Sequence, residues 1–237
     1  MRLPSLFNDL SNLLFPRKCL ICQGRLNPSE EHLCLNCLTQ LPRTLYHKRK
    51  GNEMEQHFYG SIPIERATSY LFYTPESPVH HILHAIKYYG AKKLAIYMGR
   101  CMGTHLAQEE DEFFDGIDFI IPVPLSKERM QKRGYNQSQL LAEGISQSTG
   151  IPVLSDILVR TIDNPTQTHL NRRERWENVQ GIFKATAQAR PFLENKHILL
   201  VDDVATTCAT LSNCAQAIHK EIPNCRLSIA TLALASM

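Results

Sequence analysis

The sequence predicts an α/β fold in which a parallel sheet is flanked by helices and preceded by a small cysteine-rich segment. Apolar runs with the length and composition of buried strands occur at 67–73, 117–124, 198–201 and 226–234. Helical patterns lie between most of these runs, as the crossover connections of a parallel sheet require. Two closely spaced cysteine pairs near the amino end predict a separate small unit.

Length and composition limit the possibilities. The 237 residues, 43% of them hydrophobic, can bury a sizeable core as one large domain or two small ones. A net charge of +3 and a pI near 8.4 are too mild to indicate nucleic-acid binding by themselves. No apolar run reaches the length of about 18 residues that a membrane span needs. We therefore expect no transmembrane segment and a cytoplasmic location.

The amino-terminal stretch over residues 3–14 has apolar side chains at helical spacing, and the polar residues among them make it a poor signal peptide. We expect a helix whose apolar face packs on the rest of the protein, with docking to a membrane or a partner as the alternative. This helix, the cysteine segment and a polar linker over 43–62 are assigned to a first unit at 1–60. A second domain is expected over 61–237.

The clustered cysteines form two C-x-x-C pairs separated by eleven residues: Cys19, Cys22, Cys34 and Cys37. This is the spacing of a zinc ribbon, in which each pair turns two thiolates toward one tetrahedral ion. Four protein ligands leave no open position, so the zinc is expected to be structural. Two disulfides or a redox pair are the alternatives, disfavoured by the expected compartment and by the duplicated pair. The surrounding basic residues fit either nucleic-acid contact or a solvated face.

The most informative stretch, residues 197–211, runs from four apolar residues into Asp202 and Asp203 and then into a threonine-rich turn. Open α/β sheets bind ligands where strands end and helices begin, and the free N–H groups of a first helical turn favour phosphate. The expected phosphate loop is Ala205, Thr206, Thr207, Cys208, Ala209 and Thr210. The two acids suit the vicinal hydroxyls of a sugar, or Mg²⁺. The simpler interpretation is a strand and helix of another α/β protein, with the aspartates as a helix cap.

This stretch resembles the phosphoribosyl-pyrophosphate (PRPP) motif of type I phosphoribosyltransferases, in which two acids and a threonine precede a glycine flanked by threonines. Cys208 stands where that pattern has glycine. If the position has a positive φ, a side chain there costs roughly 1–2 kcal/mol, and its Cβ lies close to a bound phosphate. The thiol, at a helix N-terminus, is expected to have a lowered pKa. The resemblance implies a type I phosphoribosyltransferase-like sheet that binds PRPP with Mg²⁺.

The middle of the chain contains helical patterns at 78–90 and 92–108. The histidines at 80, 81 and 84 have no further ligands nearby and are expected to be surface or packing residues. After the strand at 117–124, Ser126 is expected to cap a long helix. In phosphoribosyltransferases the loop after the corresponding strand faces the pyrophosphate, which implies this role for Lys127, Arg129, Lys132 and Arg133. An exposed basic helix end is the alternative.

Two further segments carry a more specific resemblance. Residues 127–145, KERMQKRGYNQSQLLAEGI, follow a proline-bracketed strand and contain Arg-Gly-aromatic-Asn-Gln, as in the ComF/GntX family. Residues 160–183 reproduce another pattern of that family at Arg160, Gln167, Leu170, Arg172, Arg175, Asn178 and Phe183. Arginines beside Trp176 suit either a grip on bases and phosphates or a cover over the sheet. The resemblance spans nearly the whole chain, which is identified as a member of the ComF family.

Membership implies two functions in different classes. The first is transfer of phosphoribose from PRPP, or binding of a related phosphosugar or nucleotide, with Mg²⁺ and an acceptor that the sequence does not identify. No catalytic base can be named. The second is a non-catalytic module whose ribbon and basic helices bind single-stranded DNA. The family is linked to DNA uptake in natural competence, with competence proteins as partners, and in the GntX branch to gluconate use. The sequence leaves open whether the chain is an enzyme.

Overall fold

A four-stranded parallel sheet in the order β1-β6-β5-β2 forms the centre of the molecule. The structure is a computed structural model that describes residues 16–108, 112–161 and 182–235. The strands are β1 (Arg66–Tyr73), β2 (Phe119–Pro122), β5 (His197–Ala205) and β6 (Arg226–Ala235). Each coincides with an apolar run of the sequence, so the expected α/β class with a parallel sheet is confirmed.

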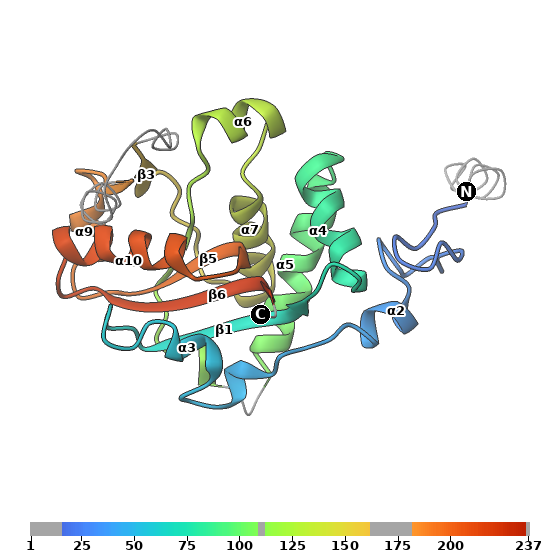
Figure 1. Cartoon of the computed structure of the whole chain (residues 1–237), viewed down its shortest axis with the longest axis horizontal. Coiled ribbons are helices and arrows are strands. Elements are labelled where there is room, and N and C mark those ends of the chain that lie inside the picture. Colours follow the sequence, from blue (N-terminus) through green and yellow to red (C-terminus); the bar gives the residue numbers. More distant parts are fainter. Residues whose placement is uncertain (1–15, 109–111, 162–181, 236–237) are drawn as a thin grey trace, which may run out of the picture.

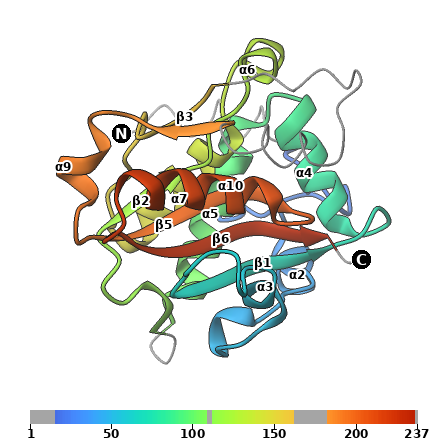
Figure 2. The same cartoon turned by 60° about the vertical axis from the view of Figure 1, so that its left-hand side comes forward.

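Helices cover both faces of this sheet (Figures 1 and 2). One face carries α4 (Pro78–Tyr88), α5 (Lys92–Leu106) and α7 (Gln137–Thr149), and the other carries α10 (Ala209–Glu221). Successive side chains of β5 alternate between them: Leu199 and Val201 pack toward the first group, whereas Ile198 and Leu200 pack toward α10. The continuous apolar run of β5 is thus buried on both faces, as is usual for a central parallel strand.

Helices α5 and α7 lie unusually close together because glycines form their contact. A Cβ atom at Gly144 would lie 2.1 Å from the carbonyl oxygen of Ile96, and one at Gly99 would lie 2.3 Å from that of Leu141. No larger residue fits at either position without a shift of backbone. The close packing holds α7 against β5 and β2, so that its first turn lies near the carboxyl edge of the sheet.

The basic helix after β2 is shorter than expected. Ser126 caps α6 (Lys127–Arg133) by accepting the N–H of Arg129 at 3.2 Å. Gly134 ends the helix after seven residues with a φ of 72°, the left-handed conformation that glycine favours. No residue of α6 is buried, and the helix projects from the body in Figure 1. The expected long helix is therefore two helices, with Asn136 capping α7.

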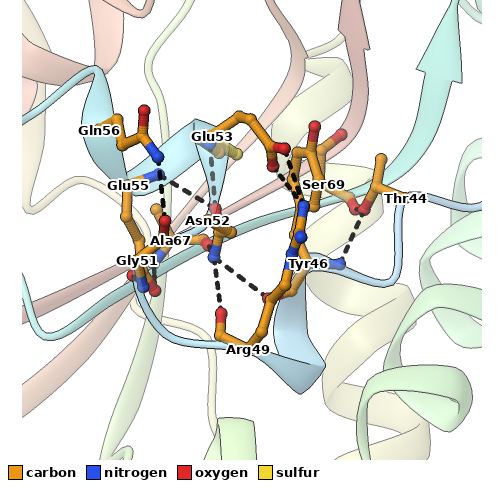
Figure 3. Close-up of polar contacts among 11 residues, drawn as sticks. Thr44, Tyr46, Arg49, Gly51, Asn52, Glu53, Glu55, Gln56, Ala67 and Ser69 are labelled. Carbon is orange, nitrogen blue, oxygen red and sulfur yellow. Dashed lines mark hydrogen bonds and ion pairs between the residues drawn. The ribbon is translucent and has the colours of Figure 1, made fainter.

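The segment expected to be a linker instead packs on β1. It contains a 3₁₀ turn, η1 (Tyr46–Lys48), and α3 (Glu53–Gln56). Asn52, 2% exposed, donates to the carbonyls of Tyr46, Arg49 and Ala67 and accepts two N–H groups of α3 (Figure 3). The polar residues that suggested a linker therefore anchor the segment to the sheet. A domain boundary at residue 60 remains a prediction.

The remaining elements are small. An antiparallel pair, β3 (Leu158–Arg160) and β4 (Phe183–Ala185), lies beside α10, and α9 (Ala189–Leu193) follows it. A 3₁₀ turn, η2 (Glu112–Phe114), precedes β2. The helix expected over 3–14 and the pattern residues Gln167, Leu170, Arg172, Arg175, Trp176 and Asn178 lie outside the described residues. Among the helices that are described, none is both long and apolar enough to span a membrane.

Candidate functional site

The four clustered cysteines converge on one point. The Sγ atoms of Cys19, Cys22, Cys34 and Cys37 all lie within 4.8 Å of one another. The first pair is turned by a hydrogen bond from the N–H of Gln23 to the carbonyl of Cys19, and α2 (Leu35–Thr39) begins at Cys34. Four thiols at this spacing fit a tetrahedral zinc ion. The ion, when bound, would hold the two pairs together.

The electrostatics of the cluster suit a bound cation. Burial opposes ionisation of Cys19, but N–H groups of Cys22, Cys34 and Ile21 outweigh it and lower the pKa of Cys19 to about 6. Burial and the neighbouring thiols raise the pKa of Cys37 to about 12. Thiols that affect each other so strongly cannot all ionise together unless a positive charge compensates them.

The cysteine segment is joined to the sheet domain by packing. Cys19 and Cys37 are buried in the same hydrophobic core as Leu83 of α4 and Leu94 of α5. At the edge of this contact, Arg100 forms an ion pair with Glu31. The cysteine segment therefore packs against the helices that cover one face of the sheet.

At the other end of the chain, β5 delivers two carboxylates and a tight turn to the carboxyl edge of the sheet. Cys208 is the N-cap of α10, with φ 57° and ψ 5°, and makes no side-chain hydrogen bond to the helix. This left-handed conformation is the one that favours glycine. Asp202 and residues 204–211 line a small hollow at the turn, where the threonines Thr206, Thr207 and Thr210 are exposed.

The thiol of Cys208 does not behave as predicted. Its side chain is 3% exposed and packs in the core beneath α10. Burial raises the pKa of Cys208 to about 11, whereas its position at a helix N-terminus led us to expect a lowered pKa. The helix dipole lowers a thiol pKa only where the sulfur faces the free N–H groups, and here it faces apolar side chains.

Each acid of β5 has a side-chain partner on a helix. Ser138 of α7 donates its hydroxyl to Asp202 Oδ1 at 2.8 Å, and the N–H of Asp203 donates to the same oxygen at 2.8 Å. Lys87 of α4 places Nζ 3.3 Å from Asp203 Oδ2. Burial, and then the charge of Asp203, raise the pKa of Asp202 to about 7 against these opposing hydrogen bonds.

These contacts decide what the acid pair can hold. Mg²⁺ in direct coordination requires near-octahedral oxygen ligands without a competing cation, but Lys87 already faces Asp203 Oδ2. The pair therefore does not fit a directly bound Mg²⁺. Sugar hydroxyls are donors and suit the two remaining carboxylate oxygens, Asp202 Oδ2 and Asp203 Oδ1.

Several known proteins are similar to this chain over most of its length. No protein-family model matches the chain. Competence protein F of Haemophilus influenzae is 27% identical over 214 residues, which cover 87% of this chain and 92% of that protein. DNA utilization protein YhgH of Escherichia coli K12 is 28% identical over 84% of this chain and 82% of its own length. Competence protein ComFC of Bacillus subtilis is 26% identical over 84% and 77%. The chain belongs to the ComF family.

Solved structures give a more distant likeness to this ComF-family chain. A glutamine PRPP amidotransferase from B. subtilis, in complex with ADP and GMP, has a TM-score of 0.42 and 18% sequence identity. The match covers 63% of this chain and 30% of that one.

The ComF-like segment Arg-Gly-Tyr-Asn-Gln joins three parts of the site. Tyr135 donates its hydroxyl to the carbonyl of Ile86, at the end of α4. The Arg133 guanidinium lies 5.6 Å from the centre of the Tyr88 ring. The Asn136 amide donates to the carbonyl of Val123, after β2. Because Ser138 follows directly, the segment connects α4, β2 and the acid pair.

The four cations of the predicted pyrophosphate loop lie at the same edge as the acids. Strands β2 and β5 are parallel neighbours, with Pro122 opposite Val201, so α6 and the acid pair both follow carboxyl ends. Lys127, Arg129 and Lys132 are exposed. Arg133, half-buried, faces the end of α4.

The α4 histidines form a row of rings with tyrosines. His80 and His84 stack at 5.5 Å, and His84 lies 4.7 Å from Tyr88 and 5.0 Å from Tyr89. His81, which is exposed, lies 6.0 Å from the His80 ring. On β3, the guanidinium of Arg160 of the second ComF pattern lies 5.5 Å from the centre of the Phe183 ring, opposite it on β4.

Sequence reasoning missed Lys87 and Ser138. Lys87 follows Leu83 by one helical turn, so it falls on the buried face of α4, where a lysine needs an acidic partner. Ser138 directly follows the Arg-Gly-Tyr-Asn-Gln segment, two residues after the helix cap Asn136. Both positions were visible as polar residues on apolar faces, but neither partner could be identified without the fold.

Proposed function

We propose that this ComF-family chain binds PRPP, or a related phosphosugar or nucleotide, at the carboxyl edge of its sheet. The 5′-phosphate would contact the turn over 205–210, and the ribose hydroxyls would contact Asp202 and Asp203. The observation that carries the proposal is the turn at Cys208, next to two carboxylates. Cys208 has a positive φ, and its side chain does not cap the first N–H groups of α10. The cations of α6 would face the pyrophosphate.

Transfer of phosphoribose at such a site would depend mainly on positioning. As pyrophosphate leaves, positive charge grows on the ribose ring, so the site has to hold the sugar and the leaving group in line with the acceptor. Carboxylates beneath the ribose stabilise that charge, and exposed cations of α6 stabilise the pyrophosphate. Mg²⁺ would accompany the pyrophosphate and neutralise part of its charge. The acceptor and the catalytic base are unassigned.

The test is calorimetric titration of PRPP with Mg²⁺ into the zinc-loaded protein. Wild type is expected to bind in the micromolar range, and Asp203→Asn is expected to weaken binding at least tenfold. Asp115→Asn, an exposed acid before β2 at the opposite edge, serves as the matched control and should bind like wild type. Absence of heat at millimolar PRPP would overturn the proposal.

A second candidate, binding of single-stranded DNA, is supported by a different surface. Tyr88 and Tyr89 at the end of α4 are 56% and 76% exposed, and Arg133 lies against Tyr88. The exposed cations Lys127, Arg129 and Lys132 belong to the same helix as Arg133. Aromatic rings beside cations stack on bases and contact phosphates. The names of the relatives, which refer to competence and DNA utilization, agree with this function and favour it over a role in gluconate use.

Salt dependence separates the two candidates. DNA binding through several phosphates should weaken steeply and log-linearly with salt, whereas a compact PRPP site should depend chiefly on Mg²⁺. The double variant Tyr88→Ala, Tyr89→Ala is expected to weaken oligonucleotide binding at least tenfold. Tyr59→Ala, with a ring that is 63% exposed elsewhere, is the control. Equal binding by both variants would exclude α4 as the contact surface.

The proposal also includes a structural zinc ion on the four cysteines and a cytoplasmic location. Four thiols within 4.8 Å of one another support the zinc. Competence proteins are the partners that the relatives' names suggest.

A further inference from the structure

Lys87 lies beside Asp202 and Asp203, two carboxylates that would otherwise attract a metal ion when no ligand is bound. Its ammonium group lies 3.3 Å from Asp203 Oδ2, with side-chain exposures of 23% for Lys87 and 14% for Asp203. At this distance, and partly screened from water, the attraction is stronger than between exposed charges.

The end of α4 that carries Lys87 is held in place by its neighbours. The hydroxyl of Tyr135 bonds to the carbonyl of Ile86, the residue before Lys87. Arg133 packs over Tyr88, the residue after it. Because both neighbours of Lys87 are fixed, its ammonium is held near Asp203 in the folded protein. The ion pair is therefore part of the folded site.

One carboxylate oxygen of Asp202 also has hydrogen-bond partners within the protein. Its Oδ1 accepts hydrogen bonds from Ser138 and from the N–H of Asp203. One oxygen of Asp203 faces the ammonium of Lys87, and one oxygen of Asp202 accepts two hydrogen bonds. The remaining acceptors are one oxygen on each residue, Asp202 Oδ2 and Asp203 Oδ1. Two hydroxyl donors on adjacent carbons match this arrangement better than one small divalent ion, which needs several oxygens around a single point.

We propose that Lys87 is the permanent counter-cation of Asp203, so that the acid pair accepts a neutral vicinal diol and excludes a directly coordinated divalent cation. The diol part of this inference rests on the proposed function. The exclusion of the cation does not, because it concerns the protein and a metal ion alone. Any metal that enters with a phosphorylated ligand is then held by the phosphates of that ligand.

The test is titration of Mn²⁺, without PRPP, into the zinc-saturated protein, with free Mn²⁺ measured by electron paramagnetic resonance. Wild type and Asp203→Asn are expected to bind Mn²⁺ equally, because wild type has no Mn²⁺ site that requires Asp203. Lys87→Met keeps the length of the side chain without its charge and is expected to bind Mn²⁺ at least tenfold more tightly than wild type. Adding Asp203→Asn to this variant should abolish the gain.

Two matched variants isolate the charge of Lys87. Lys87→Arg keeps the charge and should not gain the site, and Lys93→Met removes an exposed lysine of α5 and should match wild type. The inference is overturned if wild type already has a Mn²⁺ site that requires Asp203, or if folded Lys87→Met binds no more tightly than wild type. If Lys87→Met does not fold, the comparison of wild type with Asp203→Asn still decides. Failure of PRPP binding would instead contradict the proposed function.

Discussion

The hydroxyl of Ser138 donates a 2.8 Å hydrogen bond to the carboxylate of Asp202, across 64 positions of the sequence. The bond joins the first turn of α7 to the end of β5, where the candidate ligand site lies. It favours the ionised form of Asp202, whereas burial and the charge of Asp203 oppose that form and raise the pKa to about 7. The ionisation of this acid is thus set by the adjacent Asp203 and by Ser138 from another part of the chain.

Replacement of Ser138 by alanine should destabilise the fold in a pH-dependent way. The lost hydrogen bond stabilises the carboxylate more than the acid, so we expect a loss of about 1–3 kcal/mol at pH 8 and a smaller loss at pH 5. Urea unfolding at both pH values measures it. Ser148→Ala, which removes a hydroxyl bonded to the Ile145 carbonyl on the same helix, is the control. Equal losses at the two pH values would contradict the assigned role.

Replacement of Asp202 by asparagine should remove a pH dependence of stability. The folded-state pKa of about 7 lies above the ordinary value of 3.8, so the folded chain binds this proton more tightly than the unfolded chain. The stabilisation is complete below about pH 4 and is lost as pH rises through 7. Between these values, the free energy of unfolding of wild type should therefore fall relative to that of Asp202→Asn. A parallel pair of urea-derived stability curves would show that the pKa is not raised.

Cys208 allows the strain of the turn to be measured. Glycine and alanine both remove the buried thiol, but only glycine adopts φ 57° without strain. Cys208→Gly should therefore be more stable than Cys208→Ala by about 1 kcal/mol in urea unfolding. It should also bind PRPP more tightly, because no Cβ lies beside the phosphate. Equal stabilities would indicate that the turn changes its conformation when the cysteine is replaced.

The sequence predicts the strands, the cysteine cluster and the acid pair because their signals are local. Continuous apolar runs such as 198–201 can be buried in few other ways, and C-x-x-C spacing reflects the geometry of one ion. The segment over 43–62 shows where local signals fail. Its polar composition resembles a linker, but Asn52 bonds to the carbonyl of Ala67, and such a partner becomes visible only in three dimensions.

Asn52 should contribute strongly to stability. Its side chain satisfies three carbonyls and two N–H groups in a buried site, so Asn52→Ala leaves several polar groups without partners. We expect a loss of about 2–4 kcal/mol in urea unfolding. Gln56→Ala, which removes an exposed amide that donates to the Gly51 carbonyl, should change stability by no more than about 0.5 kcal/mol. A similarly small change in stability for Asn52→Ala would mean that the hydrogen bonds of Asn52 are not needed to anchor the segment.

Zinc analysis tests the cysteine cluster. Purified protein should contain one zinc ion per chain, and Cys34→Ser should lose it, whereas Cys101→Ser in α5 should retain it. Because Cys19 and Cys37 share a core with α4 and α5, chelation should also lower the melting temperature of the whole chain. Retention of zinc by Cys34→Ser, or melting that chelators do not affect, would contradict this arrangement.

The strand order β1-β6-β5-β2 has a consequence for how the chain acquires its structure. Among the described strands of this sheet, the two edges, β1 and β2, are made first, and the two central strands that join them are made last. Until residues 197–235 have emerged from the ribosome, β1 and β2 have no neighbouring strand in the sheet, and the backbone edges that pair with β6 and β5 remain unpaired. Pairing over such sequence separations is slow. During synthesis, the earlier part of the chain should therefore depend on chaperones, and a chain that stops before β5 should aggregate.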